Sequence, residues 1–392
     1  MSKLEELIKE LCPDGVEYYE LAQVVSPNRG VRVIKSQLKN EGKYPVFQNC
    51  LTPMGYYDSY NFPAGTSFII VGGAAAEIGY SDVDFWAADD CVGMECGEKI
   101  INRYLYHVLL NKKPYLVSNV RKASIPRLSR TVIEKMQIPV PPIPVQEEIV
   151  RILDSFTELT AELTAELTAR KKQYEYYRDK LLTFGNVCGA TSDVVWRTLG
   201  EIADITDYVA NGSFASLREN VTYKNERDFA ALIRTVDYSS NFDLSKMVYV
   251  DEHAYNFLKK SQLFGGEIII NNIGAGVGTT FRCPNLGMPM TLAPNAVMIR
   301  TENNDFYYHW FSSKIGQEAI QKIVGKSAMP KFNKTGLRAI KVPVPPLDVQ
   351  NRIVNVLDNF DSICSDLKIG LPAEIEARRK QYEYYRNLIL SF

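Results

Sequence analysis

The chain contains 392 residues, in which 45 Lys and Arg nearly balance 46 Asp and Glu, so that its net charge is −1. A hydrophobic content of 46% and a charged content of 23% are ordinary for a globular protein and exclude a chain that is disordered or coiled-coil throughout. At about 150 residues per domain, this length predicts two or three domains. The charged N-terminus lacks the apolar centre of a secretion signal, and no apolar run reaches the roughly 18 to 20 residues of a membrane-spanning helix, so we expect a cytoplasmic protein.

The first half of the chain predicts a mixed globular domain followed by one long helix. A β-rich run at 66–71 leads into the glycine-rich turn Gly72–Gly79, and a helical pattern covers 103–110. After the string VPPIP, apolar residues recur every three or four positions over 146–184, through tandem TAEL repeats. This stripe predicts a helix long enough for a coiled coil. The prolines before it are expected to form a stiff exit from the domain rather than a ligand for a partner.

The second half predicts the same order of elements. The β-rich run 267–270 leads into the turn Asn271–Gly278, and a helical pattern covers 307–323. A second apolar stripe then follows VPVPP, stops at 370–372 (Gly-Leu-Pro) and resumes from about Ala373. Since glycine followed by proline ends a helix, we expect the second long helix to be interrupted there.

Self-comparison shows that the chain contains two copies of one unit. The hexapeptide QYEYYR occurs at 173–178 and again at 381–386, and residues 138–156 match 342–360 at an offset of 204. The offset has grown to 208 at QYEYYR, so the second copy carries four extra residues, about one helical turn. We therefore expect one scaffold that carries two different surfaces.

These patterns predict an α+β fold with a pseudo-two-fold internal repeat. Two domains with curved, mostly antiparallel sheets would be separated by two long helices that pair as an antiparallel coiled coil. The expected segments are 1–145 for the first domain with a short N-terminal helix, 146–188 for the first long helix, 189–345 for the second domain, and 346–392 for the second long helix, interrupted near 370–372.

Sequence motifs of catalysis and of cofactor binding are missing. The GxGxG turn at 274–278 departs from the dinucleotide motif, and Gly325-Lys326-Ser327 is not a phosphate loop because position 320 is isoleucine. The seven cysteines form no CxxC pair, and the three histidines are distant in sequence from the two cysteines that lie closest to each other, Cys91 and Cys96. This pattern predicts free thiols rather than a zinc site. A binding protein therefore fits better than an enzyme, and we expect neither a metal nor a cofactor in this chain.

The distribution of charge favours a polyanionic partner although the net charge does not. Residues 99–135 contain nine Lys and Arg and one acid, and residues 300–341 contain eight Lys and Arg and three acids. Basic stretches interleaved with Ser, Asn and Tyr suit contacts with phosphates. A solvated basic face is the alternative, and recurrence in both halves argues against it.

The motifs together resemble the specificity subunits of Type I restriction–modification systems. The similarity lies in two dissimilar domains with near-identical helices, the TAEL repeats, the PVPP and VQ pattern, and KKQYEYYRDKLL, and it extends over the whole chain. It implies that each domain is a target recognition domain for one half of a bipartite DNA site, and that the helices set the spacing. It also implies that the helices bind two adenine-N6 methyltransferase subunits, which carry S-adenosylmethionine, and that restriction belongs to a further subunit. This chain would then be non-catalytic.

Internal correspondence gives the candidates for contact with DNA, since the recognition domains of this family vary. Gln48 and Asn49 follow one apolar strand as Arg234 and Thr235 follow another, and side chains of these types bind base edges. The other candidates lie in turns or basic loops. The full set is Arg29, Arg32, Gln48, Asn49, Arg121, Lys122, Asn211, Ser213, Arg218, Arg234, Thr235, Asn271, Asn272, Lys326 and Lys331.

The repeated helix ends give the candidates for binding the methyltransferase. The alternative for the tyrosines is that they pack the core of the coiled coil. The candidates are Gln146, Arg170, Lys171, Lys172, Tyr174, Arg178, Gln350, Arg378, Arg379, Lys380, Tyr382 and Arg386. Two other functions remain open at this point: the recognition subunit of a fused restriction–methylation enzyme, and a coiled-coil adaptor that does not bind DNA.

Overall fold

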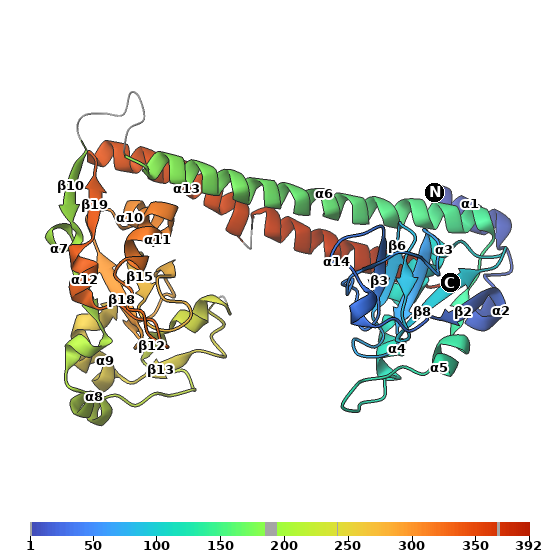
Figure 1. The fold of residues 1–392 in the computed structure, drawn as a ribbon, viewed down its shortest axis with the longest axis horizontal. Coiled ribbons are helices and arrows are strands. Elements are labelled where there is room, and N and C mark those ends of the chain that lie inside the picture. Colours follow the sequence, from blue (N-terminus) through green and yellow to red (C-terminus); the bar gives the residue numbers. More distant parts are fainter. Residues whose placement is uncertain (1, 185–193, 241, 367–368) are drawn as a thin grey trace. The chain divides into compact units, whose positions relative to one another are not determined.

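The computed structural model describes residues 2–184, 194–240, 242–366 and 369–392, which form two compact units (Figure 1). Unit 1 combines residues 1–165 with 373–392, and unit 2 contains residues 166–372. Each unit thus joins a globular domain to parts of the long helices, and the boundary between the units lies within one helix, α6 (Ile143–Leu182).

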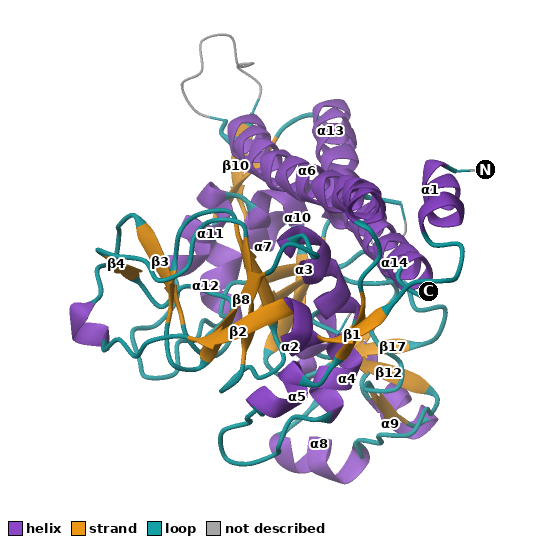
Figure 2. Ribbon diagram, turned by 90° about the vertical axis from the view of Figure 1, so that its right-hand side faces the viewer, coloured by secondary structure: helices purple, strands orange, loops and turns teal. Residues whose placement is uncertain are grey.

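The globular part of unit 1 contains short helices around small sheets. Its four-stranded sheet has the order β2-β8-β5-β6 and is antiparallel throughout, and a second sheet has the order β4-β3-β7 with β3 and β7 parallel. β2 and β8 lie side by side with α2 beside them (Figure 2). The elements are α1 (Lys3–Leu11), β1 (Tyr18–Glu20), α2 (Leu21–Val24), β2 (Val25–Arg29), β3 (Tyr44–Phe47), β4 (Tyr56–Tyr57), β5 (Thr66–Ile70), β6 (Ile78–Ser81), β7 (Trp86–Ala87), β8 (Cys91–Cys96), α3 (Asn102–Asn111), α4 (Lys113–Ser118), α5 (Arg130–Glu134) and β9 (Gln137–Pro139).

Unit 2 repeats this plan with different details. Its four-stranded antiparallel sheet has the order β11-β18-β15-β16, and its second sheet has the order β13-β12-β17-β14 with β12 and β17 parallel. The elements are β10 (Val195–Thr198), α7 (Leu199–Ile202), β11 (Asp204–Asp207), α8 (Phe214–Asn220), β12 (Ala230–Ile233), β13 (Val248–Val250), α9 (Glu252–Phe257), β14 (Gln262–Leu263), β15 (Ile268–Asn271), β16 (Thr280–Arg282), β17 (Met290–Leu292), β18 (Ala296–Arg300), α10 (Asn304–Ser312), α11 (Lys314–Gln321), α12 (Lys334–Ala339), β19 (Lys341–Val344) and α13 (Leu347–Ser365).

These sheets confirm the predicted α+β class with mostly antiparallel strands. Both glycine-rich turns connect antiparallel neighbours, β5 to β6 and β15 to β16. The helical pattern at 307–323 was predicted as one helix and forms two, α10 and α11. Ser313 separates them because its hydroxyl accepts a hydrogen bond from the Gly316 N–H at 3.3 Å and so starts a new helix.

A two-stranded antiparallel ladder closes each domain at the point where the chain enters and leaves it. β1 pairs with β9 in unit 1, and β10 pairs with β19 in unit 2. In the repeat, Tyr18 opposite Pro139 corresponds to Trp196 opposite Pro343. The proline strings leave these ladders directly into α6 and α13, which explains why the similar segments of the two halves lie at the domain ends.

Two of the long helical segments begin slightly before the predicted positions, whereas α13 begins at Leu347, directly after the predicted position 346. α6 begins at Ile143 rather than Gln146, and α14 (Leu371–Ile389) begins at Leu371 rather than Ala373, because the prolines at positions 144 and 372 fit a first turn. α13 ends at Ser365, and a Cβ added to Gly370 would lie 2.7 Å from the carbonyl oxygen of Asp366. A side chain at this glycine would therefore crowd the backbone that separates α13 from α14.

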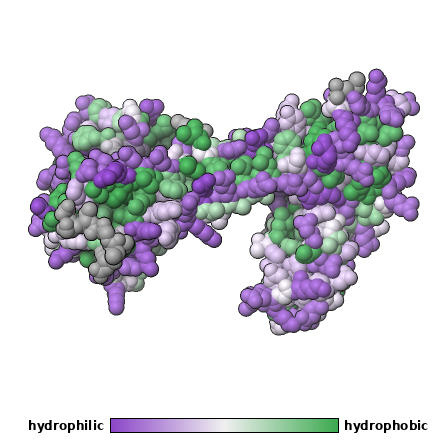
Figure 3. Space-filling model, turned by 90° about the horizontal axis from the view of Figure 1, so that it is seen from above, coloured by the Kyte–Doolittle hydropathy of each residue, from purple (hydrophilic) through white to green (hydrophobic). Residues whose placement is uncertain are grey.

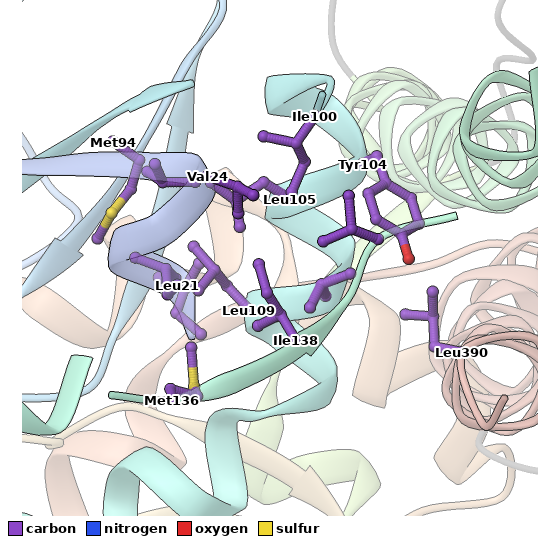
Figure 4. Close-up of a cluster of buried hydrophobic side chains, with 14 of the residues drawn as sticks. Leu21, Val24, Met94, Ile100, Tyr104, Leu105, Leu109, Met136, Ile138 and Leu390 are labelled. Atoms are coloured by element: carbon purple, nitrogen blue, oxygen red, sulfur yellow. The ribbon is translucent and has the colours of Figure 1, made fainter. Parts of the chain in front are cut away.

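The core of unit 1 combines residues that are far apart in sequence. Leu21, Leu105 and Ile138 are buried together with Leu390, which directly follows α14 (Figure 4). Within this unit α14 runs antiparallel to the first part of α6 (Figure 1), and the rings of Phe156 and Tyr385 stack at 5.4 Å. The C-terminal segment is therefore part of the first domain's folded unit.

Among the described residues, no helix is long and apolar enough to cross a membrane, and no cluster of His, Cys, Asp and Glu has the geometry of a metal site. Six cysteines in the described part of the chain are free thiols, and Cys188 lies outside it.

Candidate nucleic-acid interface

In unit 1, several candidates meet beside the loop that precedes β8. Gln48 Nε2 donates to Asp89 Oδ1 at 3.3 Å, and Arg29 Nε donates to the backbone oxygen of Asp89 at 2.7 Å. Asn49 is exposed, and its backbone oxygen accepts from the Ala74 N–H at 2.9 Å in the glycine-rich turn. The sequence candidates Arg29, Gln48 and Asn49 are thus brought to one region that is accessible to a ligand.

Arg234, the counterpart of Gln48 in the repeat, is committed to an internal ion pair. Its Nη2 lies 2.5 Å from Asp237 Oδ1 and 3.0 Å from the backbone oxygen of Lys246. The Asp237 side chain is buried, and it also accepts from the backbone N–H of Arg234 at 2.9 Å. The role predicted for Arg234 is therefore corrected: its guanidinium closes the turn after β12, and contact with a guanine would require breaking this pair. Thr235, which follows, is half-buried.

Asn271 and Asn272 lie at the end of β15, where the glycine hairpin begins. The backbone oxygen of Asn272 accepts from the Phe332 N–H at 3.2 Å, whereas its side-chain Oδ1 is buried and has no hydrogen-bond partner among the described residues. Asn272 lines a cavity of about 190 Å³ together with Phe214 and Lys331. Asn271 accepts a long hydrogen bond, 3.5 Å, from the Ile273 N–H.

Two candidates of unit 2 have structural roles that sequence alone did not reveal. Asn211 donates to Tyr208 O at 2.9 Å and to Ser261 Oγ at 2.8 Å, and accepts from the Lys260 N–H at 2.8 Å. Ser213 caps the N-terminus of α8 by accepting from the Ser216 N–H at 3.2 Å. The prediction of DNA contact by Asn211 is corrected, because its amide is already bonded to groups of its own unit, whereas Ser213 is exposed and its contact with DNA stays a prediction.

The remaining candidates are exposed and available for contact. They are Arg32, Arg121, Lys122, Arg218, Lys326 and Lys331. The basic segment 99–135 offers fewer unpaired cations than the residue count suggested. Its residues Arg103, Lys113 and Arg130 each form an ion pair with an acid of their own unit.

Gln146 and Gln350, predicted to bind a partner, are buried inside the units instead. Gln146 Oε1 accepts from the Ile101 N–H at 2.9 Å, and its Nε2 donates to the carbonyl oxygens of Lys99 and Pro141 at 2.8 and 2.7 Å. Gln350 makes only the equivalent bond to Pro345 O, at 2.9 Å, and its Oε1 has no partner among the described residues. Both predictions are corrected: the glutamines tie the proline exit to the start of the helix.

A buried histidine joins the first domain to both helices of unit 1. His107 on α3 is fully buried; its Nε2 lies 2.8 Å from Asp154 on α6, and its Nδ1 lies 2.9 Å from the hydroxyl of Tyr382 on α14. Arg103 adds a second contact to the Asp154 carboxylate at 2.9 Å. Burial lowers the pKa of His107, which therefore favours the neutral ring.

Unit 2 contains the same constellation. His309 on α10 is fully buried and lies 2.8 Å from Asp358 on α13 and 3.1 Å from the hydroxyl of Tyr174 on α6. Arg282 on β16 supplies the second contact to Asp358, at 2.8 Å. Burial alone would raise the pKa of Asp358, but the hydrogen bonds from His309 and Arg282 outweigh it and hold that pKa at about 2.

We call these two constellations the histidine clamps: Arg103, His107, Asp154 and Tyr382 in unit 1, and Arg282, His309, Asp358 and Tyr174 in unit 2. They correct the assignment of Tyr174 and Tyr382 to a partner surface. The histidines were missed because they were considered only as metal ligands. A sequence signal existed, since both follow a tyrosine, as Tyr106-His107 and Tyr308-His309.

The two copies of this architecture are matched separately by one family model. The model, described as the Type I restriction modification DNA specificity domain, matches residues 13–170 and again 191–377. The chain belongs to this family. Each match runs from the strand ladder of one domain into the long helix that follows it, so the family unit coincides with the repeat.

Known specificity subunits resemble the chain over most of its length. A putative type I restriction enzyme specificity subunit of Haemophilus influenzae is 31% identical, with 99% of this chain and 98% of that protein covered. The EcoR124I/EcoR124II specificity subunit of Escherichia coli is 33% identical over 79% of this chain and 76% of its own length. The solved S subunit from M. genitalium has the same fold at 16% identity, with a TM-score of 0.60 and coverage of 96% and 97%.

The basic residues of the long helices differ in whether their side chains already contact other groups of their own unit. Arg178 lies over the Tyr174 ring and Arg386 over the Tyr382 ring, at 5.5 and 5.4 Å, so both support the clamps. Arg170 and Arg378 contact glutamates on their own helices. Lys171, Lys172, Arg379 and Lys380 are exposed, although Lys380 also lies 3.4 Å from Glu376 on its own helix, and for these four residues the partner role remains a prediction. In the face that Figure 3 presents, hydrophilic and hydrophobic residues are interspersed on each unit.

Proposed function

We propose that this chain supplies the DNA sequence specificity of a Type I restriction–modification complex. Each globular domain recognises one half of a bipartite site in duplex DNA, and the helices set the number of base pairs between the halves. The observation that carries the proposal is the duplication: two units share the ladder, the histidine clamp and the family match, while their exposed loops differ. Two recognition domains of different specificity require this combination of a shared scaffold, which fixes each domain to the helices, and loops that differ between the two domains.

The chain acts as a non-catalytic subunit in this proposal. Its helices bind two adenine-N6 methyltransferase subunits, which carry S-adenosylmethionine, and the restriction subunits join the complex through them. The exposed cations near the helix ends, Lys171 and Lys172 in one copy and Arg379 and Lys380 in the other, recur in both halves and are the candidate contacts. Since the proposed ligand is the genome, we place the complex in the cytoplasm.

Methylation mapping tests the proposal. The chain is co-expressed with its methyltransferase, and N6-methyladenine is mapped across the host genome by single-molecule sequencing, with a strain that lacks only this chain as the control. We expect a split motif with a fixed gap that disappears in the control. An unchanged pattern in the control would refute the proposal and favour a coiled-coil adaptor.

A further inference from the structure

Each unit carries an exposed loop with an apolar residue at its tip. The loops are residues 121–127 (RKASIPR) and 325–331 (GKSAMPK), which correspond at the repeat offset of 204; we call them the tip loops. Ile125 is 55% exposed and Met329 is 61% exposed. A single exposed apolar side chain is ordinary. An exposed apolar side chain recurs at the same place in both copies, together with a lysine three residues before it and a proline directly after it, and this recurrence indicates a shared function.

The backbone holds both tip loops in place. Arg121 N–H donates to Arg127 O at 2.8 Å, and Gly325 N–H donates to Lys331 O at 2.9 Å, so that each loop is closed at its base. The glycine-rich turns bind the loops from the side, since Gly73 N–H donates to Pro126 O at 3.1 Å.

In the same way Gly274 N–H donates to Pro330 O at 2.9 Å. The exposed tips are therefore held beside the two glycine-rich turns. The second turn begins with the DNA-contact candidates Asn271 and Asn272, and the first is bonded to the backbone of the candidate Asn49 through the Ala74 N–H. The first tip loop, between α4 and α5, extends away from the body of its unit (Figure 1).

The charge around the tips identifies the class of partner. Residues 119–129 and 321–333 contain no acid. Lys122 and Lys326 occupy equivalent positions next to the apolar tips, and both are exposed. Arg127 is over half exposed although it contacts Asp90 at 3.2 Å. An apolar side chain between cations suits duplex DNA, where the cations bind phosphates while the apolar group packs against bases in the groove.

We propose that the two tip loops bind duplex DNA, with Ile125 and Met329 packed against bases and Lys122 and Lys326 bound to flanking phosphates. This inference rests on the proposed function and adds the residues by which it is achieved. It assigns the exposed apolar tips to DNA rather than to the methyltransferase surface, because residues 119–129 and 321–333 carry cations and no acid, which suits a polyanion.

Salt dependence separates the two kinds of contact. The complete methyltransferase complex is titrated with a duplex carrying its mapped site at several salt concentrations. Ile125→Ser and Met329→Ser should each weaken binding about tenfold, as expected for losing roughly one buried aliphatic side chain, with the slope of log K against log salt unchanged. Lys122→Gln and Lys326→Gln should each reduce that slope by about 0.9, the value for one phosphate contact.

Val83→Ser and Leu244→Ser are matched controls. Val83 and Leu244 are also exposed, at 53% and 45%, but they lie beside aspartates, and their loss should leave the affinity unchanged. If the tip variants bind DNA like the wild type, or lose methyltransferase in co-purification while retaining affinity for DNA, the inference is wrong. If the wild-type complex shows no site-dependent binding, the proposed function itself fails.

Discussion

Replacing Asp154 by alanine removes the acceptor at the centre of the first histidine clamp. The carboxylate binds Arg103 Nε at 2.9 and 3.1 Å and His107 Nε2 at 2.8 Å, and His107 is fully buried. Leaving one buried donor unsatisfied costs about 1–3 kcal/mol, and losing a partner of a fully buried ion pair costs about 3–5 kcal/mol. Because Asp154 remains 24% exposed and solvent screens part of the pair, we expect a loss of about 2–3 kcal/mol in the free energy of unfolding of unit 1.

Hydrogen exchange on the complete chain is the assay, because it reports each unit separately. In Asp154→Ala, exchange should accelerate in α3 and α14 of unit 1 and stay unchanged in α10 and α13 of unit 2. Asp358→Ala should give the reverse. Arg352→Ala removes an ion pair whose two side chains are 75% and 70% exposed, and it should change neither unit. The reasoning is refuted if Asp154→Ala exchanges like Arg352→Ala, or if both units loosen equally.

Three further predictions concern pH, the buried glutamines and the TAEL repeat. Because burial lowers the pKa of His107, the unfolded chain binds the imidazole proton more readily than the folded chain does, and unit 1 should lose stability as the pH falls through the unfolded pKa of about 6.5. His107→Gln should reduce the difference between the free energies of unfolding measured by denaturation at pH 7 and at pH 5. An equal difference in the variant and the wild type would contradict this prediction. Gln146→Ala should destabilise its unit by about 2–4 kcal/mol, because it leaves three backbone groups unpaired. Gln350→Ala should destabilise its own unit less, because it removes one such bond. Equal losses of stability in denaturant titrations would count against the role of Gln146 in tying the proline segment to the helix start. One additional TAEL unit lengthens α6 by about 6 Å, whereas one base pair spans about 3.4 Å of the DNA axis. With the helix inclined to the DNA, the insertion should add about one base pair to the gap that is preferred when a series of sites with different spacers is methylated. An unchanged preferred gap would refute the proposal that helix length sets the spacing.

Sequence predicted the fold in its main lines because the signals were local or duplicated. Apolar periodicity defined the long helices, and the glycine and proline at 370–372 indicated the break between α13 and α14. The starts of α6 and α14 were predicted too late because proline is compatible with a first turn. The combination of residues 373–392 with the first domain could not be predicted, since it depends on a core that joins Leu390 to residues hundreds of positions earlier.

The candidate site was predicted less well, because residue type does not show what a side chain is already bonded to. Asn211 and Gln146 carry amide groups that could bind a ligand, yet these amides already form hydrogen bonds with backbone groups of their own unit. Arg234 follows a strand as expected but is paired with buried Asp237. Conversely, the tyrosine–histidine pairs were visible in both halves, but only their burial shows that they join domains to helices.

Exchange of one recognition domain tests the central claim most directly. Residues 199–340, between the ladder strands β10 and β19, are replaced by the corresponding segment of a relative with a different known site, and N6-methyladenine is mapped in a host that expresses the hybrid with its methyltransferase. The account predicts a split motif in which one half is replaced by a half-site of the relative, while the other half is unchanged. Alteration of both halves, or a motif identical to that of the wild type, would contradict the assignment of one half-site to each domain.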